Sequence, residues 1–204
     1  FNNDSLRKIK SDKADSVKIA RYALDKWQSL EPYSITDELR AQLKVMNRQF
    51  HFYVKQKTAM KNNLIGLIDQ TYPNANTYFN SPTRSDGSQK WVDFVSTYWH
   101  VDCIRKMSLN AFVEHYQNWC KRKKYAFNKS KAEEIYTKTK ELVPVFPKNE
   151  ITKHIIRQAI DQLNSTSVTV ETIRTLMNET ASKLPEYSIV MQFKGIGPSL
   201  GPQL

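Results

Sequence analysis

The chain has 204 residues, and its 31 Lys and Arg outnumber its 20 Asp and Glu, which gives a formal net charge of +11 at pH 7. Such a surplus of cations favours a polyanionic partner, and the phosphate backbone of DNA or RNA is the usual one. No apolar run approaches the roughly 20 residues of a membrane-spanning helix, and no signal-peptide pattern opens the chain. We therefore expect a cytoplasmic protein with no membrane partner.

The predicted fold is all-α, because the chain has only five glycines and almost no β-branched alternation. A first helix is predicted from about residue 12 to residue 28. After the break at Pro32, Thr36 is a suitable N-cap, with the acids Asp37 and Glu38 in the first turn. It opens a helix that is expected to reach Gln70, a length of about 50 Å.

This long helix carries an apolar seam with the 4-3 spacing of a coiled coil, and a second long helix, predicted over residues 148–183, carries another. The first seam is interrupted chemically only by Lys57. Its positions are Leu39, Leu43, Met46, Phe50, Tyr53, Lys57, Met60, Leu64 and Leu67, and those of the second are Ile156, Ala159, Leu163, Thr166, Val170, Ile173, Met177, Thr180 and Leu184. The spacing leaves open whether the seams pair within one chain or between chains.

Between the seams, residues 72–147 are rich in aromatic side chains and predict a small helical insert subdomain. Helices are expected at residues 89–99, 109–123 and 131–143, the last with Ser130 and Glu133 in capping-box positions. His100, Cys103, His115 and Cys120 have a superficial zinc-site spacing, but on amphipathic helices we interpret them as packing and surface residues.

Several basic positions are candidates for nucleic-acid binding. Lys121–Lys124 lie among Trp119, Tyr125 and Phe127, which would suit phosphate contacts and base stacking. The alternative is a helix C-terminus whose cations complement the dipole and whose Trp119 is core. A second basic face would lie off the first seam, although solvated coiled-coil flanks look similar. The full candidate set is Lys8, Lys10, Arg40, Lys44, Arg48, Lys55, Lys61, Lys121, Arg122, Lys123, Lys124, Lys194, Gly195 and Gly197.

The two glycines in that set, Gly195 and Gly197, suit a turn whose exposed N–H groups grip a phosphate, as in a helix-hairpin-helix, although most short Gly-x-Gly patterns are plain turns. At the other end of the chain, Asp12 and Asp15 lie three residues apart, so both carboxylates share a helix face and could bind one divalent cation. Acids in a first helical turn also cap the helix and complement its dipole without any metal. Spacing alone does not separate the two interpretations.

The segment Lys10-Ser-Asp12-Lys-Ala-Asp15-Ser-Val-Lys-Ile19-Ala20 resembles the end of the RuvC-like domain in DEDD transposases of insertion-sequence family one-ten, which are bridge-RNA-guided recombinases. Ser16 stands where that family usually has Ala. The long basic helical middle and the Gly195-Ile-Gly-Pro segment follow in the family's order. The resemblance implies that Asp12 and Asp15 are the last two of four acids that bind Mg²⁺. It places the other two acids upstream of Phe1 and a serine nucleophile downstream of Leu204.

The resemblance thus implies an internal fragment, with its parts in five segments. These are the tail helix of a truncated RuvC-like domain (1–34), a first coiled-coil helix (35–71), the insert (72–147), a second coiled-coil helix (148–184) and the truncated start of a transposase domain (185–204). The implied function is Mg²⁺-dependent DNA strand cleavage and exchange, with DNA and a guide RNA as partners and self-association as a dimer or tetramer. The fragment itself is expected to be inactive. The alternatives are a non-enzymatic helical module that dimerises and binds nucleic acid, and a RuvC-like junction nuclease.

Overall fold

The computed structural model describes residues 12–26 and 38–203, and the chain divides into two units, residues 1–37 and 38–204. In the first unit, α1 runs over Asp12–Lys26, close to the predicted helix, while the predicted N-cap Thr36 lies outside the described residues. The described residues form helices, turns and loops without a strand, which confirms the all-α prediction. Within them, no helix is both long and apolar enough to cross a lipid bilayer.

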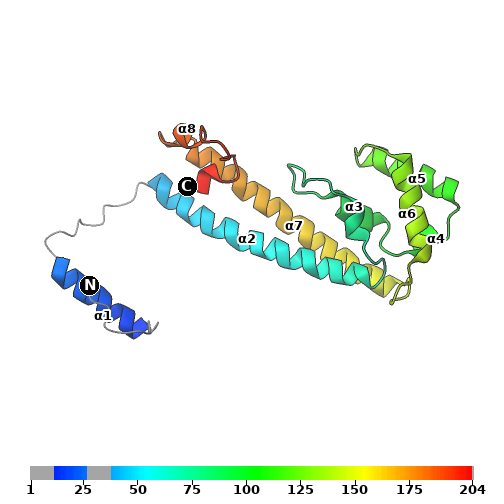
Figure 1. Ribbon diagram of the computed structural model, residues 1–204, viewed down its shortest axis with the longest axis horizontal. Helices are drawn as coiled ribbons and strands as arrows, with labels where there is room; N and C mark the ends of the chain where they lie inside the picture. Colours follow the sequence, from blue (N-terminus) through cyan, green and yellow to red (C-terminus); the bar gives the residue numbers. More distant parts are fainter. Residues whose placement is uncertain (1–11, 27–37, 204) are drawn as a thin grey trace. The chain divides into compact units, whose positions relative to one another are not determined.

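Two helices of 32 residues each, α2 (Glu38–Asp69) and α7 (Glu150–Ala181), lie side by side and run in opposite directions (Figure 1). Three contacts along the pair show the antiparallel order. Arg40 binds Glu186 near one end, the Arg174 guanidinium lies 5.7 Å from the Phe50 ring centroid, and Thr166 contacts the Met60 sulfur at 3.0 Å. The two predicted seams therefore face each other within one chain.

Every predicted seam position is buried or half-buried, because the repeat keeps these residues on the side that faces the other helix. Leu64 and Leu163 have no exposed surface, and Val170 has 1%. Lys57, the charged position of the first seam, is half-buried. Burial lowers the pKa of its amine, and the nearby Glu171 carboxylate opposes this effect. The pair is thus held by the residues that the sequence pattern predicts.

The insert consists of η2 (Ala75–Tyr78), α3 (Lys90–Thr97), α4 (Asp102–Arg105), α5 (Leu109–Arg122) and α6 (Lys129–Glu141). Its core is a set of aromatic rings in mutual contact at centroid distances of about 5 to 6.5 Å, among them Tyr72, Phe94, Tyr98, Tyr116 and Trp119. The predicted capping box at Ser130 and Glu133 is wrong. The side chain of Asn128 caps α6 instead by accepting the N–H of Lys131 at 3.0 Å, so the helix begins two residues earlier.

The insert is anchored to the pair at the end of α2. The Thr71 hydroxyl donates to the Trp99 carbonyl at 2.7 Å, and the Gln70 carbonyl accepts the N–H groups of Val145 and Phe146 at 2.8 and 3.0 Å. Two consecutive residues that directly follow α2, Gln70 and Thr71, therefore hold the insert to the pair.

The C-terminal segment folds back on the other end of the pair through α8 (Tyr187–Val190) and η3 (Gly201–Gln203). Asn178 of α7 tethers it, because its amide donates to the Pro198 carbonyl at 2.7 Å and its amide oxygen accepts the Tyr187 hydroxyl at 2.7 Å. Gly201 and Pro202 are buried. This segment contains no full-length second helix of a helix-hairpin-helix over residues 185–203.

Candidate nucleic-acid interface

The outer side of α2 carries cations without acids. Between its terminal acids, Glu38 and Asp69, the helix holds six Lys and Arg and no Asp or Glu. Five of them lie off the seam on one side of the helix, and we call them the basic face: Arg40, Lys44, Arg48, Lys55 and Lys61. Lys44, Arg48 and Lys55 are exposed, Lys61 is half-buried, and none of these four has a carboxylate partner within the described residues. The basic face therefore presents charge that the fold does not neutralise.

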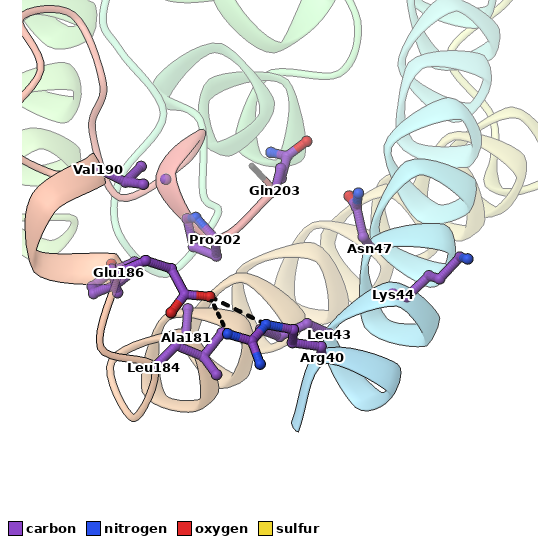
Figure 2. Close-up of a pocket in the computed structure, with 12 residues that line it drawn as sticks. Arg40, Leu43, Lys44, Asn47, Ala181, Leu184, Glu186, Val190, Pro202 and Gln203 are labelled. Atoms are coloured by element: carbon purple, nitrogen blue, oxygen red, sulfur yellow. Dashed lines mark hydrogen bonds and ion pairs between the residues drawn. The ribbon is translucent and has the colours of Figure 1, made fainter. Parts of the chain in front are cut away.

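Arg40 lies at the end of the basic face, where it meets the C-terminal segment. Its Nε and Nη2 atoms donate to the same Glu186 carboxylate oxygen at 3.2 and 2.6 Å (Figure 2). The Glu186 pKa is lowered, first by its own backbone N–H and then by the Arg40 guanidinium. Beneath this ion pair lies an open cavity of about 310 Å³ with a mostly apolar lining that includes Leu43, Leu184 and Pro202. Arg40 thus also fastens the C-terminal segment to α2.

The second predicted basic cluster, Lys121–Lys124, ends α5, and part of it is structural. Lys123 Nζ lies 2.8 Å from an Asp93 carboxylate oxygen, and the other oxygen accepts the Tyr125 hydroxyl at 2.7 Å. Lys121, Arg122 and Lys124 are exposed, and Lys124 adopts a positive φ of 55° where the chain leaves the helix. Three of the four predicted cations therefore remain accessible.

The aromatic side chains beside this cluster are not available as a stacking platform. Trp119 is 1% exposed and belongs to the core of the insert. The Tyr125 ring is covered by the Arg84 guanidinium, whose carbon atom lies 3.9 Å from the ring centroid. Only Phe127, 37% exposed, offers a partly open ring. The core interpretation of Trp119 is therefore correct.

Arg84 has a structural role in this corner that the sequence analysis did not predict. Its guanidinium also donates to the carbonyls of Lys123 and Lys124 at 2.8 and 3.1 Å, which satisfies the C-terminal end of α5. The contact joins positions 39 and 40 residues apart, so no local pattern marks it. In the sequence, Arg84 stands out only as a cation within a turn-like stretch, and this gives no indication of its partners.

The glycine turn near the C-terminus keeps its predicted backbone character. Gly195 has a φ of 94°, which favours glycine, and a Cβ at Gly195 or Gly197 would meet nothing within 4 Å. Lys194 beside them is exposed. The element after the turn, η3, has three residues, so the described part of the C-terminal segment offers no helix N-terminus that could help bind a phosphate.

The two predicted metal-binding acids lie on α1. Asp12 begins the helix and Asp15 follows one turn later. The Asp15 carboxylate is exposed and lies 3.6 Å from Lys18 Nζ, whereas the Asp12 side chain, with Lys8 and Lys10, lies outside the described residues. Among the described side chains, no group of three or more His, Cys, Asp or Glu is arranged to hold a metal. Two carboxylates at this spacing are hard oxygen donors that suit Mg²⁺ but fill only part of its coordination sphere.

The histidines with the zinc-like spacing are engaged in hydrogen bonds. His100 is 1% exposed, with Nε2 3.0 Å from the Phe146 carbonyl and Nδ1 accepting the Asp102 N–H at 3.0 Å. His115 Nδ1 lies 2.6 Å from the Tyr98 hydroxyl. These residues hold the insert together.

An all-helical chain with an unneutralised basic helix face has the features of a nucleic-acid-binding protein. Residues 1–73 match a family model described as Transposase (DEDD_Tnp_IS110), so this part of the chain is similar to DEDD transposases of the IS110 type. The match confirms the resemblance drawn from Asp12 and Asp15, and it extends over all of α2. It supports a role in transposition with DNA as a partner. No curated protein and no solved structure matches the chain.

Proposed function

We propose that the chain acts in transposition by binding the phosphate backbone of nucleic acid along the basic face of α2. The observation that carries this proposal is the run of six cations without an acid between Glu38 and Asp69, inside the region that matches the transposase family. Lys44, Arg48 and Lys55 are exposed on one side of a rigid helix. From Lys44 to Lys61 the face extends over about 26 Å, enough for several phosphate contacts.

Binding at this face would depend on charge and shape more than on base sequence. Lys and Arg side chains on an outer helix face position a phosphate backbone, whereas base readout needs side chains that reach base edges or stack on unpaired bases. Trp119 and Tyr125, the aromatics that suggested stacking, are occupied within the insert. DNA and a guide RNA both offer the required backbone, and we propose both as partners.

We also propose that Asp12 and Asp15 belong to the Mg²⁺ site of the transposase. Their oxygens would be two of its protein ligands, and the remaining acids would come from outside this sequence. When bound, the metal would stabilise charge that develops on a phosphodiester during DNA strand cleavage. Within this chain, α1 contributes the spacing that puts the two acids on one helix face.

The experiment that tests the basic face compares two triple variants by fluorescence anisotropy with a labelled DNA duplex at fixed salt. Replacement of Lys44, Arg48 and Lys55 by Ala is expected to weaken binding at least tenfold. The matched control replaces Lys148, Arg157 and Lys183, exposed cations on or beside α7, by Ala and removes the same charge. Equal losses from the two variants would contradict the proposal, because only net charge would then matter.

A second candidate, a non-enzymatic nucleic-acid-binding module, is favoured by the fact that residues 38–204 form a unit with its own core and basic face. The two candidates differ in the role of Asp12 and Asp15. In a transposase that includes this segment, Asp12→Asn or Asp15→Asn should abolish Mg²⁺-dependent strand cleavage while nucleic-acid binding persists. A RuvC-like junction nuclease would instead prefer branched DNA over paired element ends.

A further inference from the structure

The open cavity beneath the Arg40–Glu186 ion pair, which we call the end cavity, adjoins the basic face. Four side chains of α2 line it at intervals of three and four residues, so they share one face of the helix. They are Arg40, Leu43, Lys44 and Asn47. Lys44 is an exposed member of the basic face, and Arg48 follows it one turn later. A phosphate backbone bound to Lys44 and Arg48 therefore runs along the edge of the end cavity.

The opposite wall of the end cavity comes from the end of α7 and the C-terminal segment. Leu184, Val190 and Pro202 line it with apolar surface, and Pro202 is buried. Tyr187 also lines the cavity, and its hydroxyl donates to the Asn178 amide oxygen at 2.7 Å, which fixes the position of its ring. The end cavity thus has apolar walls on two sides, a lining that suits the faces of a flat ligand.

Two amide side chains, those of Asn47 and Gln203, also line the end cavity, and Figure 2 shows both of them away from the Arg40–Glu186 ion pair. The Asn47 amide oxygen is buried and has no hydrogen-bond partner within the described residues, which costs free energy until a donor reaches it. An amide side chain offers a donor and an acceptor side by side. This combination recognises the edge of a nucleobase.

An unpaired nucleobase has the chemistry that matches this lining. Its faces are flat and apolar, its edge carries donors and acceptors, and it remains attached to a phosphate. The cavity volume, about 310 Å³, lies at the lower end of the range of ligand pockets, roughly 300–1,000 Å³, and fits one base rather than a stacked pair. The Glu186 carboxylate in the lining is paired with Arg40 at 2.6 Å, so it opposes a phosphate only weakly. A purely apolar ligand would leave the Asn47 oxygen unsatisfied.

We propose that the end cavity takes a single unpaired nucleobase from a strand whose phosphates lie on the basic face. The inference rests on the proposed function, because the basic face brings the strand to the cavity. The base edge bonds to the amides of Asn47 and Gln203, its faces contact Leu184 and Val190, and its phosphate contacts Lys44. A base within a duplex must leave its stack to enter, so the cavity favours single strands, loops and bulges over intact duplex.

The test measures binding of the whole chain by fluorescence anisotropy to three labelled probes of one sequence: single-stranded DNA, single-stranded RNA and duplex DNA. Asn47→Ala removes an amide, and Val190→Trp fills the cavity from the opposite wall. Each is expected to weaken single-strand binding about tenfold and to leave duplex binding unchanged, because a duplex contacts only the basic face. A loss with the DNA or the RNA strand alone supports the proposal and identifies the nucleic acid. A loss with both supports a cavity that does not distinguish the sugar.

Two matched controls lie outside the end cavity. Gln49→Ala removes an exposed amide from the same helix, and Ile189→Trp adds the same ring at a neighbouring position that is 59% exposed. Both should bind all three probes as the wild type does, with the same helical circular dichroism. A loss of single-strand binding in these controls would contradict the proposal.

Single-strand binding that survives both Asn47→Ala and Val190→Trp would overturn the proposal. So would an equal loss with single strand and duplex, because the variants would then act on the fold and not on a base. Failure of the proposed function gives a different result, namely unchanged duplex binding after replacement of Lys44, Arg48 and Lys55. The basic face and the end cavity are thus tested separately.

Discussion

The basic face of α2 and the insert are both rich in Lys and Arg, yet the fold uses their cations differently. In the insert, acids are interspersed, and Lys123, Lys131 and Lys138 pair with Asp93 or Glu134 at 2.8 to 2.9 Å. On α2, no acid interrupts the run between Glu38 and Asp69, and Lys44, Arg48 and Lys55 stay exposed. The density of positive charge is therefore a poor guide to a binding surface. A better guide to a binding surface is whether the fold leaves that positive charge without carboxylate partners.

The exposure of the basic face depends first on the packing of α2 against α7. Leu64→Asp puts a carboxylate at a fully buried seam position, so it is expected to lower the free energy of unfolding by more than about 4 kcal/mol. Thermal unfolding followed by circular dichroism measures the effect. Ala59→Asp is the control, because Ala59 is exposed on the same helix and should change stability only slightly. Equal stability of the two variants would mean that α2 is not held through this seam.

A substitution at Arg84 tests whether a cation of the insert has a structural role. Arg84→Ala removes two hydrogen bonds to the end of α5 and the contact over Tyr125, and is expected to cost about 1–2 kcal/mol. Hydrogen exchange should show faster exchange in α5 and the adjoining loop, while α2 keeps its protection. Arg122→Ala, next to the same helix end but exposed, should leave exchange unchanged. A similar response to both substitutions would contradict a specific role of Arg84.

The smallest predicted effect concerns Lys57, the cation of α2 that faces the seam. Lys57→Met should stabilise the chain by about 1 kcal/mol at neutral pH, because the half-buried ammonium is replaced by an apolar chain. Its pKa is lowered from 10.5 in the folded chain, so between the folded and unfolded pKa values the unfolded chain binds more protons. Wild-type stability therefore rises with pH in that window.

The advantage of Lys57→Met should accordingly shrink as the pH rises toward 10.5. Urea unfolding at pH 7 and at alkaline pH, with the exposed Lys55→Met as control, measures this change. An advantage that grows with pH would show that burial does not penalise the Lys57 ammonium.

The sequence predicts the helical pair well because a seam repeat over many turns leaves one way to bury the apolar residues. It does not predict that the seams pair within the chain, since that depends on where the insert returns the second helix. Ser130 and Glu133 have the spacing of a capping box, yet Asn128 is the N-cap of α6, because its side chain accepts the N–H of Lys131. Local patterns cannot choose between neighbouring caps of similar strength.

Part of the candidate site was also predictable from the seam repeat. The cations on α2 follow from seam geometry, because residues off the seam must face outward. The contacts of Arg40 with Glu186 and of Arg84 with the end of α5 join residues distant in sequence, and no spacing rule reaches them. The burial of Trp119 likewise depends on the whole aromatic core of the insert.

The most direct measurement is the salt dependence of duplex binding for the wild type and two variants. One has Lys44, Arg48 and Lys55 replaced by Ala, and the other has Lys123, Lys131 and Lys138, which pair with acids of the insert, replaced by Ala. Each phosphate contact contributes about 0.9 to the slope of log affinity against log salt. The account predicts that the α2 variant loses roughly 2 to 3 units of slope and that the insert variant retains nearly all of it. A larger loss in the insert variant would place the nucleic acid there and contradict the account.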